Sequence, residues 1–235
     1  MHTIKIEVIC PGCKSSAIIK NGKKSKTTHQ NYRCKTCSRQ FILDKDKVYE
    51  GSKQGVFHKI KRMLSRGCGV KDIAVIEQIS IGRVLSVIKQ LHFKVSPKRY
   101  HYDTLEIDEL WSYVQKKENK QWIIYAYDRE TGEIVAWVKG KRDAKTARKL
   151  RKKLRELGVT YNTIASDDWK SFKTAFKDDN HIIGKEHTKG IEGNNCRIRH
   201  RMKRLSRKTC CFSKNEENHW KVFELVVFYI NFGFV

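Results

Sequence analysis

The spacing of hydrophobic positions changes along the chain, and each change predicts a different kind of element. In the first fifty residues, the runs SAIIKNGKK and HQNYRCKTC are typical of short strands joined by a polar, basic turn. After residue 103, the runs TLEIDELWSYVQ, KQWIIYAYDRETGEIVAWVKG and VTYNTIAS are rich in β-branched and aromatic residues and predict longer strands. The chain therefore combines a small β segment with a larger region that begins with strands.

Residues 54–92, between these two regions, repeat their apolar positions at helical spacing. A glycine-bounded turn, a short helix from about Lys71 and a break near Ser80 follow one another, and Ser80 is a suitable N-cap for a further helix. The inward positions of that last helix are Val84, Leu85 and Ile88, and its outward positions include Arg83 and Lys89. This order matches a helix-turn-helix whose last helix enters the major groove, and a generic helical linker is the alternative.

The larger region has its own internal order. The segment DRETGE predicts a hairpin turn between the second and third strands, and residues 143–157 predict a basic helix. The stretch KVSPKRYHYD, which contains one of the two prolines, marks a boundary before this region. The pattern predicts a multidomain α+β chain, with domains at residues 1–50, 51–95 and 103–235 and a mixed sheet in the last of them.

Net charge indicates the kind of partner. The formal charge is +25, and residues 1–102 carry 22 Lys and Arg against 6 Asp and Glu. Such an excess of positive charge favours polyanions, so we expect DNA or another nucleic acid to bind. No run reaches the roughly eighteen apolar residues of a membrane span, and the first residues lack a signal-peptide pattern, so we expect a cytoplasmic protein without a membrane partner.

Four cysteines define the first domain. Cys10-Pro-Gly-Cys13 and Cys34-Lys-Thr-Cys37 are separated by 20 residues, a spacing that lets two knuckles converge on one tetrahedral Zn²⁺. A segment of about forty residues has too small a core to fold without such a staple, so we predict a zinc ribbon. The alternative is two unrelated pairs of buried thiols. The cysteines without ligand spacing are interpreted as small packing residues, and they are Cys68, Cys196, Cys210 and Cys211.

Acidic residues follow an apolar run in the stretch IASDDWKSF. Asp167 and Asp168 stand at the end of a predicted strand, and alternation places Glu106 and Asp108 on one face of the first strand of this region. Ligands of mixed sheets collect at strand ends, so Asp108 and Asp167 are candidate metal ligands. The alternative is that these acids are solvated turn and helix-cap residues.

A third carboxylate begins a cationic helix. Glu192, Asn195 and Arg199 share one side of the helix predicted from KGIEGNNCRIRHRMKR. Residues 185–214 hold ten Lys and Arg, and their acids are Glu186 and Glu192. The cationic surroundings suit phosphates, whereas the alternative is a first-turn glutamate that complements the helix dipole, worth only about 0.3–1 kcal/mol.

Short motifs in order along the chain resemble a known family. They are CPGC, NGK, HQNYRCKTC, IDELWSYV, YAYD, SDDW, IIGKEHT, IEGNN, MKRLSRKT and CFSK. Together they resemble the insertion sequence 1 family of DDE transposases over nearly the whole chain. The resemblance implies a zinc-ribbon and helix-turn-helix region that binds element ends, followed by a ribonuclease-H-like catalytic domain.

The resemblance also implies the site residues. Its acidic triad corresponds to Asp108, Asp167 and Glu192, which would hold Mg²⁺ or Mn²⁺. Two such ions about 3.5–4 Å apart can activate a water or a DNA 3′-hydroxyl and stabilise the leaving oxygen. The DNA-binding residues are predicted to be Arg83, Lys89, Asn195, Arg199 and Arg201. Asp168 stands where the family more often has glycine, and we interpret it as the N-cap of the helix that carries Trp169.

The predicted function is a transposase that binds element terminal repeats, cleaves DNA strands and joins them to target DNA, as a homo-oligomer on DNA that is nucleoid-associated when bound. Three alternatives remain at this stage. A structure-specific nuclease would use the same acids without joining, and a zinc-ribbon regulator would bind DNA without cleaving it. A tyrosine recombinase would use the cluster IRHRMKR and Tyr229 and would leave the acids without a task.

Overall fold

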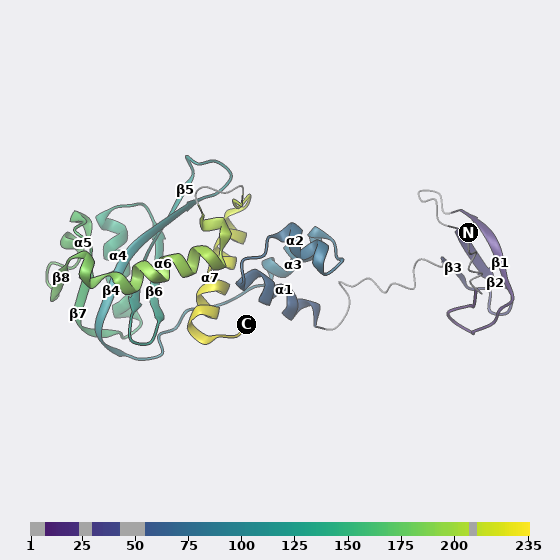
Figure 1. The fold of residues 1–235 in the computed structure, drawn as a ribbon, viewed down its shortest axis with the longest axis horizontal. Helices are drawn as coiled ribbons and strands as arrows, with labels where there is room; N and C mark the ends of the chain where they lie inside the picture. The colour runs from purple at the N-terminus through teal and green to yellow at the C-terminus, as the bar shows by residue number, and fades with distance from the viewer. Residues whose placement is uncertain (1–7, 24–29, 43–54, 207–210) are drawn as a thin grey trace. The chain divides into compact units, whose positions relative to one another are not determined.

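The computed structural model divides the chain into two compact units, Met1–Lys53 and Gln54–Val235. It describes residues 8–23, 30–42, 55–206 and 211–235 (Figure 1). Within these described ranges, no helix combines the length and the apolar character needed to cross a membrane. The two units differ in what holds them together, since the first depends on cysteines and the second on hydrophobic cores.

The first unit is a three-stranded antiparallel sheet in the order β1-β2-β3. Its strands are β1 (Ile18–Lys23), β2 (Gln30–Cys34) and β3 (Gln40–Ile42). The first two are the predicted strands, and the third is too short for alternation to reveal it. Among the described residues of this unit, only Cys10 and Cys34 are buried, and one aromatic pair, Tyr32 on Phe41, stacks with ring centroids 5.9 Å apart. The described part of this unit thus has almost no hydrophobic core.

Three helices open the second unit. They are α1 (Val56–Ser65), α2 (Val70–Ile76) and α3 (Ile81–Lys89). The Ser80 hydroxyl accepts a hydrogen bond from the N–H of Arg83 at 3.1 Å, which confirms the predicted N-cap. Val84 and Ile88 of α3 are fully buried, and α1 and α3 pack against the last helix, α7 (Glu216–Phe232). The three-helix segment is therefore part of the second unit's core.

A five-stranded mixed sheet forms the body of the second unit, in the order β6-β5-β4-β7-β8. The strands are β4 (His101–Tyr113), β5 (Lys120–Asp128), β6 (Glu133–Gly140), β7 (Thr160–Ser166) and β8 (His181–Ile183). Strands β4, β5 and β6 are antiparallel neighbours, whereas β7 runs parallel to β4 and β8 parallel to β7. The mixed α/β architecture and the hairpin between β5 and β6 are as predicted.

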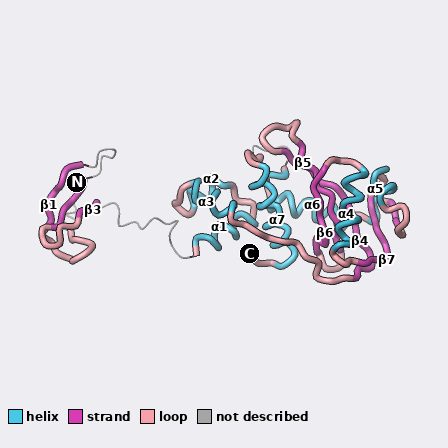
Figure 2. Tube along the Cα trace, turned by 180° about the vertical axis from the view of Figure 1, so that it is seen from behind, coloured by secondary structure: helices cyan, strands magenta, loops and turns pink. Residues whose placement is uncertain are grey.

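Helices cover both faces of this sheet (Figures 1 and 2). One face carries α4 (Ala144–Glu156) and α5 (Lys170–Ala175), and the other carries α6 (Lys189–Arg201) and α7. Two short 3₁₀ turns flank α6, at Lys185–His187 and Lys203–Leu205. Along β4, Leu105 and Ile107 pack in the core that contains α4 and α5, and Leu110 packs in the core that contains α6 and α7. The central strand is therefore buried on both sides.

His219, on α7, is fully buried. Its Nδ1 lies 2.8 Å from the Ser213 hydroxyl oxygen, and its Nε2 has no hydrogen-bond partner within the described structure. Burial, together with the smaller effect of the positive charge of Arg204, lowers the pKa of His219 to about 4. The folded protein thus holds this imidazole neutral.

Acidification from pH 7 to pH 4 should destabilise the protein through His219. The unfolded chain binds the imidazole proton near pH 6.5 and the folded chain near pH 4, so the unfolded state gains a proton between these values. The free energy of unfolding should fall by about 1.4 kcal/mol per pH unit in this window. Denaturant unfolding across pH should show the stability advantage of wild type over His219→Gln shrinking as pH falls, and a constant difference would contradict the assignment.

Candidate active site

Three carboxylates meet at the end of β7. This strand stops at Ser166, opposite Ile107, and β4 continues past that point. Asp108 and Glu109 lie on the continuation of β4, and Asp167 is the first residue after β7. One carboxylate oxygen from each of these three residues lies within 4.8 Å of the other two. The structure thus brings the two predicted aspartates together and adds a glutamate.

Glu109 reaches the cluster from the opposite face of the sheet. Side chains alternate along a strand, so Asp108 faces α6 whereas Glu109 faces the side of α4. The contacts agree, because Asp108 bonds Asn195 of α6 and Glu109 bonds Arg142, just before α4. β7 no longer separates the two faces here, so carboxylates from both can meet. Glu109 was not predicted, because alternation places it on the opposite face of the strand from Asp108; its position directly beside Asp108 was the available signal.

Two hydrogen bonds hold Asp108. The Asn195 amide donates to Oδ2 at 2.6 Å, and the N–H of Glu109 donates to Oδ1 at 2.7 Å. The pKa of Asp108 is raised to about 7, chiefly by burial and also by the negative charges of Glu109 and Asp167, although its two hydrogen bonds act to lower the pKa. Ionising these buried, mutually repelling carboxylates costs free energy. A bound divalent cation would favour their ionised form, so the arrangement suits a metal site.

Asn195 belongs to a buried network beneath the carboxylates. Its side-chain oxygen accepts a hydrogen bond from the fully buried Tyr125 hydroxyl at 2.8 Å, and the Asn194 amide donates to the same hydroxyl at 3.3 Å. Asn195 itself is only 5% exposed. Asn195 was predicted to bind DNA, and in the structure its side chain is buried and hydrogen-bonded to Asp108 and Tyr125.

The N-terminus of α6 is docked on a buried carboxylate of β4. Glu106 is 3% exposed and accepts the N–H of Ile191 at 2.5 Å. Gly190 is required at this approach, because a Cβ there would lie 2.7 Å from Oε1 of Glu106. The contact fixes α6, and with it Asn195 and Glu192, over β4.

Glu192, the third predicted catalytic acid, lies in the first turn of α6 and is exposed. It is not part of the three-carboxylate cluster. Residues three apart lie on the same side of a helix, so Glu192 is a neighbour of Asn195, which contacts Asp108. Glu192 thus lies one helical turn from the residue that bonds Asp108, and its carboxylate is outside the cluster.

The predicted basic residues lie in two places. Arg199 is half-buried on α6, and its Nε has no hydrogen-bond partner in the part of the chain that the structure describes. The guanidinium of Arg201 stacks on the ring of Tyr229, 4.7 Å from its centroid. Arg83 and Lys89 occupy α3, where Arg83 is half-buried and Lys89 is exposed in the last turn.

Asp168 does not cap α5, which corrects the prediction. The helix begins at Lys170, its N-cap residue is Trp169, and no side chain caps it. The carboxylate of Asp168 is 75% exposed and pairs with Lys173. Asp167 enters the cluster instead, and its Oδ1 accepts the N–H of Trp169 at 3.2 Å. The N-cap position lies one residue later than predicted, at Trp169 instead of Asp168.

The second candidate metal site lies in the first unit. The sulfur atoms of Cys10, Cys13, Cys34 and Cys37 form one cluster, with Sγ–Sγ distances of 3.5 Å for Cys10–Cys37 and for Cys13–Cys34. Tetrahedral coordination with Zn–S bonds of about 2.3 Å requires sulfurs roughly 3.8 Å apart, so the cluster fits zinc. The backbone N–H of Cys37 is the main cause that lowers the pKa of Cys34 to about 6, and such bonds favour the thiolate that zinc needs.

The other cysteines only partly match their predicted packing role. Cys68 is half-buried and packs against the core. Cys196 and Cys211 are exposed, so the packing interpretation is wrong for them. Cys210 lies outside the described residues.

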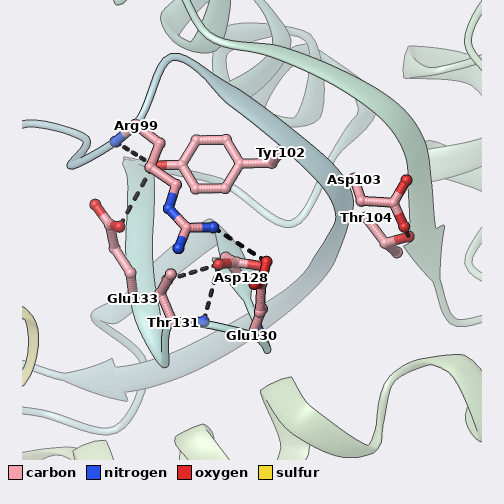
Figure 3. Close-up of polar contacts among 8 residues, drawn as sticks. All are labelled: Arg99, Tyr102, Asp103, Thr104, Asp128, Glu130, Thr131 and Glu133. Carbon is pink, nitrogen blue, oxygen red and sulfur yellow. Dashed lines mark hydrogen bonds and ion pairs between the residues drawn. The ribbon is translucent and has the colours of Figure 1, made fainter.

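A further group of acids, at the turn between β5 and β6, is structural (Figure 3). Glu133 is fully buried and accepts hydrogen bonds from the N–H of Lys98 at 2.7 Å and the hydroxyl of Tyr102 at 3.4 Å. Asp128 accepts the N–H and the hydroxyl of Thr131, at 3.0 and 2.6 Å, and thereby closes the turn. Hydrogen bonds within the fold thus account for Glu133 and Asp128.

Comparisons with known proteins agree with this arrangement. The IS1 transposase family matches residues 104–232, and the InsA N-terminal domain, a zinc ribbon, matches residues 1–38. The insertion element iso-IS1n protein InsB of Shigella dysenteriae is 42% identical over 117 residues, which cover 50% of this chain and 88% of the relative. The insertion element IS1 2 protein InsB of Escherichia coli (strain K12) is 38% identical over 117 residues, covering 50% and 69%.

Among solved structures, a cryo-EM structure of a simian T-cell lymphotropic virus intasome with the PP2A regulatory subunit B56 gamma covers 70% of this chain and 66% of its own matched chain. The identity is 11% and the TM-score is 0.39, so this structural likeness is not used to assign a function. The family matches show that the chain is a transposase, an enzyme that acts on DNA. It belongs to the IS1 transposase family, and its first unit is a zinc ribbon of the InsA type.

Proposed function

We propose that this transposase binds the terminal repeats of an insertion element, cleaves DNA strands and joins them to target DNA with Mg²⁺ or Mn²⁺. The observation that carries the proposal is the meeting of Asp108 and Asp167 at the end of β7, beneath the helix that bears Glu192. Strands β4 to β7 with their covering helices would form the ribonuclease-H-like core that the family resemblance implies. The three proposed domains would be a zinc ribbon at residues 1–50, a helix-turn-helix that binds DNA at residues 51–95 and the catalytic domain at residues 103–235.

The chain's own residues would prepare the site for metal and phosphate. Asp108 and Asp167 supply oxygen ligands, and Asn195 with Tyr125 keeps Asp108 turned toward them. Glu192 would add its carboxylate once DNA occupies the site. Bound Mg²⁺ would supply Lewis acidity to the attacking and leaving oxygens of the phosphodiester.

DNA near the cluster would be held by the cationic side of α6. Arg199 has a buried Nε without a hydrogen-bond partner in the described structure, an arrangement that suits an arriving phosphate oxygen. Arg201 lies two residues further along α6, where its ring contact with Tyr229 fixes its direction. Both residues remain proposed DNA ligands.

The N-terminal half would recognise the element ends. The zinc ribbon and the three-helix segment, as a helix-turn-helix with α3 in the major groove, would contact terminal repeats, and pairing of two ends would require a homo-oligomer on DNA. A cytoplasmic location with the nucleoid follows from this function and stays a prediction.

A strand-transfer assay tests the proposed function. The full chain is incubated with labelled element ends and a target plasmid, with and without Mg²⁺. Joined products that require Mg²⁺ are the expected result. Cleaved but unjoined ends would favour the nuclease alternative, and binding without any cleavage would favour the regulator.

Replacing Arg83 and Lys89 by alanine should weaken binding to element ends and flatten its salt dependence. Each lost phosphate contact should reduce the slope of log K against log salt by about 0.9. Binding measured from low to moderate salt checks this, and the double change Lys152→Ala with Lys153→Ala, at two exposed positions of α4, is a control that removes the same two charges. A changed sequence preference at constant slope would show base contacts instead, and an unchanged slope and preference would contradict the assignment.

A further inference from the structure

One carboxylate oxygen of Glu109 forms no hydrogen bond within the described residues. Its side chain is 10% exposed, and Oε2 is buried without a hydrogen-bond partner within the described residues. Leaving a buried carboxylate oxygen unpaired costs free energy, so such an atom calls for a ligand. The neighbours of this carboxylate in the cluster are Asp108 and Asp167, each offering an oxygen within 4.8 Å.

The other oxygen of Glu109 is firmly held. Oε1 accepts a hydrogen bond from Nε of Arg142 at 2.7 Å and forms an ion pair with Nη2 of the same residue at 2.6 Å. The guanidinium of Arg142 in turn lies 4.7 Å from the ring centroid of Trp169 and 5.6 Å from that of Trp122. Two aromatic rings thus fix Arg142, and Arg142 fixes Glu109 with Oε2 left over. A side chain oriented in this way is preorganised for a ligand.

We propose that Glu109 is a metal ligand of the active site. Its Oε2 forms, with Asp108 and Asp167, a three-carboxylate site for one divalent cation that is complete before DNA or Glu192 contributes. Carboxylate oxygens are the ligands that Mg²⁺ and Mn²⁺ prefer, and the remaining positions are filled by water and later by substrate phosphate. The proposal rests on the proposed function, because it concerns the metal site of strand cleavage and joining.

A Mn²⁺ titration of the zinc-loaded full chain, without DNA, tests the proposal. The electron paramagnetic resonance signal of free Mn²⁺ measures how much of the ion is bound. Loss of groups that merely support a ligand costs about 10–100-fold in metal affinity, so Glu109→Gln, which removes a ligand, should weaken Mn²⁺ binding at least about tenfold. Glu192→Gln should leave the affinity unchanged within about twofold. Glu156→Gln, an exposed glutamate on α4, controls for the change in charge.

A second variant separates ligation from simple charge. Glu109→Asp keeps the charge but withdraws the carboxylate by one methylene, so a ligand role predicts weakened binding and a purely electrostatic role predicts wild-type binding, which would overturn the proposal. Melting temperature and zinc content show whether each variant is folded.

The outcomes also separate this inference from the proposed function. Weak Mn²⁺ binding by Asp108→Asn with wild-type binding by Glu109→Gln would overturn only the role of Glu109. Wild-type binding by Asp108→Asn and Asp167→Asn together would overturn the carboxylate metal site itself.

Discussion

Asp108→Asn, Asp167→Asn and Glu192→Gln should each abolish strand cleavage and strand joining together. Each change keeps the shape of the side chain and removes a charge that would hold metal, before DNA binds for Asp108 and Asp167 and once DNA occupies the site for Glu192. Metal ions stabilise the transition state of phosphoryl transfer by several kcal/mol, and about 1.4 kcal/mol corresponds to tenfold in rate, so we expect losses of at least about a thousandfold. The strand-transfer assay with labelled element ends measures both steps.

Asp168→Asn is the matched control, because this neighbouring aspartate is exposed and pairs with Lys173 outside the cluster. It should retain near-normal cleavage and joining. End binding and zinc content should be intact in all four variants. A dead Asp168→Asn beside an active Asp167→Asn would move the ligand by one residue, and full activity in all three triad variants would falsify the metal mechanism. Loss of joining alone would point to the basic surface around Arg199 and Arg201.

Removal of zinc should unfold the described part of the first unit, residues 8–23 and 30–42. The buried residues in the described ranges of this unit are Cys10 and Cys34, and Tyr32 stacks on Phe41. Structural zinc binding contributes about 10–16 kcal/mol in comparable small domains, which is effectively all of their folding free energy. Amide hydrogen exchange of these residues should lose its protection on chelation or in Cys34→Ser.

Cys196→Ser provides the control, because Cys196 is exposed and is not part of the four-sulfur cluster. This variant should keep one zinc per chain and the protection of the ribbon. Metal analysis that finds no zinc in fresh, reduced wild-type protein would contradict the prediction, as would a protected ribbon after chelation.

Hydrophobic periodicity was sufficient for most of the fold. The helical spacing of Val56, Ile60 and Leu64 corresponds to α1, and the run VTYNTIAS corresponds to β7. Each such element buries one or both faces, and the buried positions appear in the sequence as regularly spaced apolar residues. The sequence analysis gave no element for α7, whose run VFELVVFYINF is apolar on nearly every side because α7 is packed between the sheet and the three-helix segment. A helix without a polar stripe shows no helical period.

The site residues whose positions depend on a single strand or helix could be predicted from the sequence. The position of Asp108 on a strand face and of Asp167 at a strand end follows from alternation and from the length of the apolar run. The role of Glu109 depends on where β7 stops relative to β4, a tertiary relation that no local pattern records. Asn195 was predictable as a residue on the correct side of α6, but its burial depends on Tyr125, 70 residues away in sequence.

The packing of α7 against both the three-helix segment and the sheet has a geometric consequence. Because α3 and the carboxylates belong to one compact unit, the distance between them is fixed. If α3 binds the terminal repeat, this fixed distance determines which phosphodiester reaches Asp108 and Asp167. The cleavage position is then set by its distance from the bound repeat, and the bases at the cleavage position do not need to be recognised. Extra base pairs between repeat and cut site would then displace the cut within the element's sequence and leave its distance from the repeat unchanged.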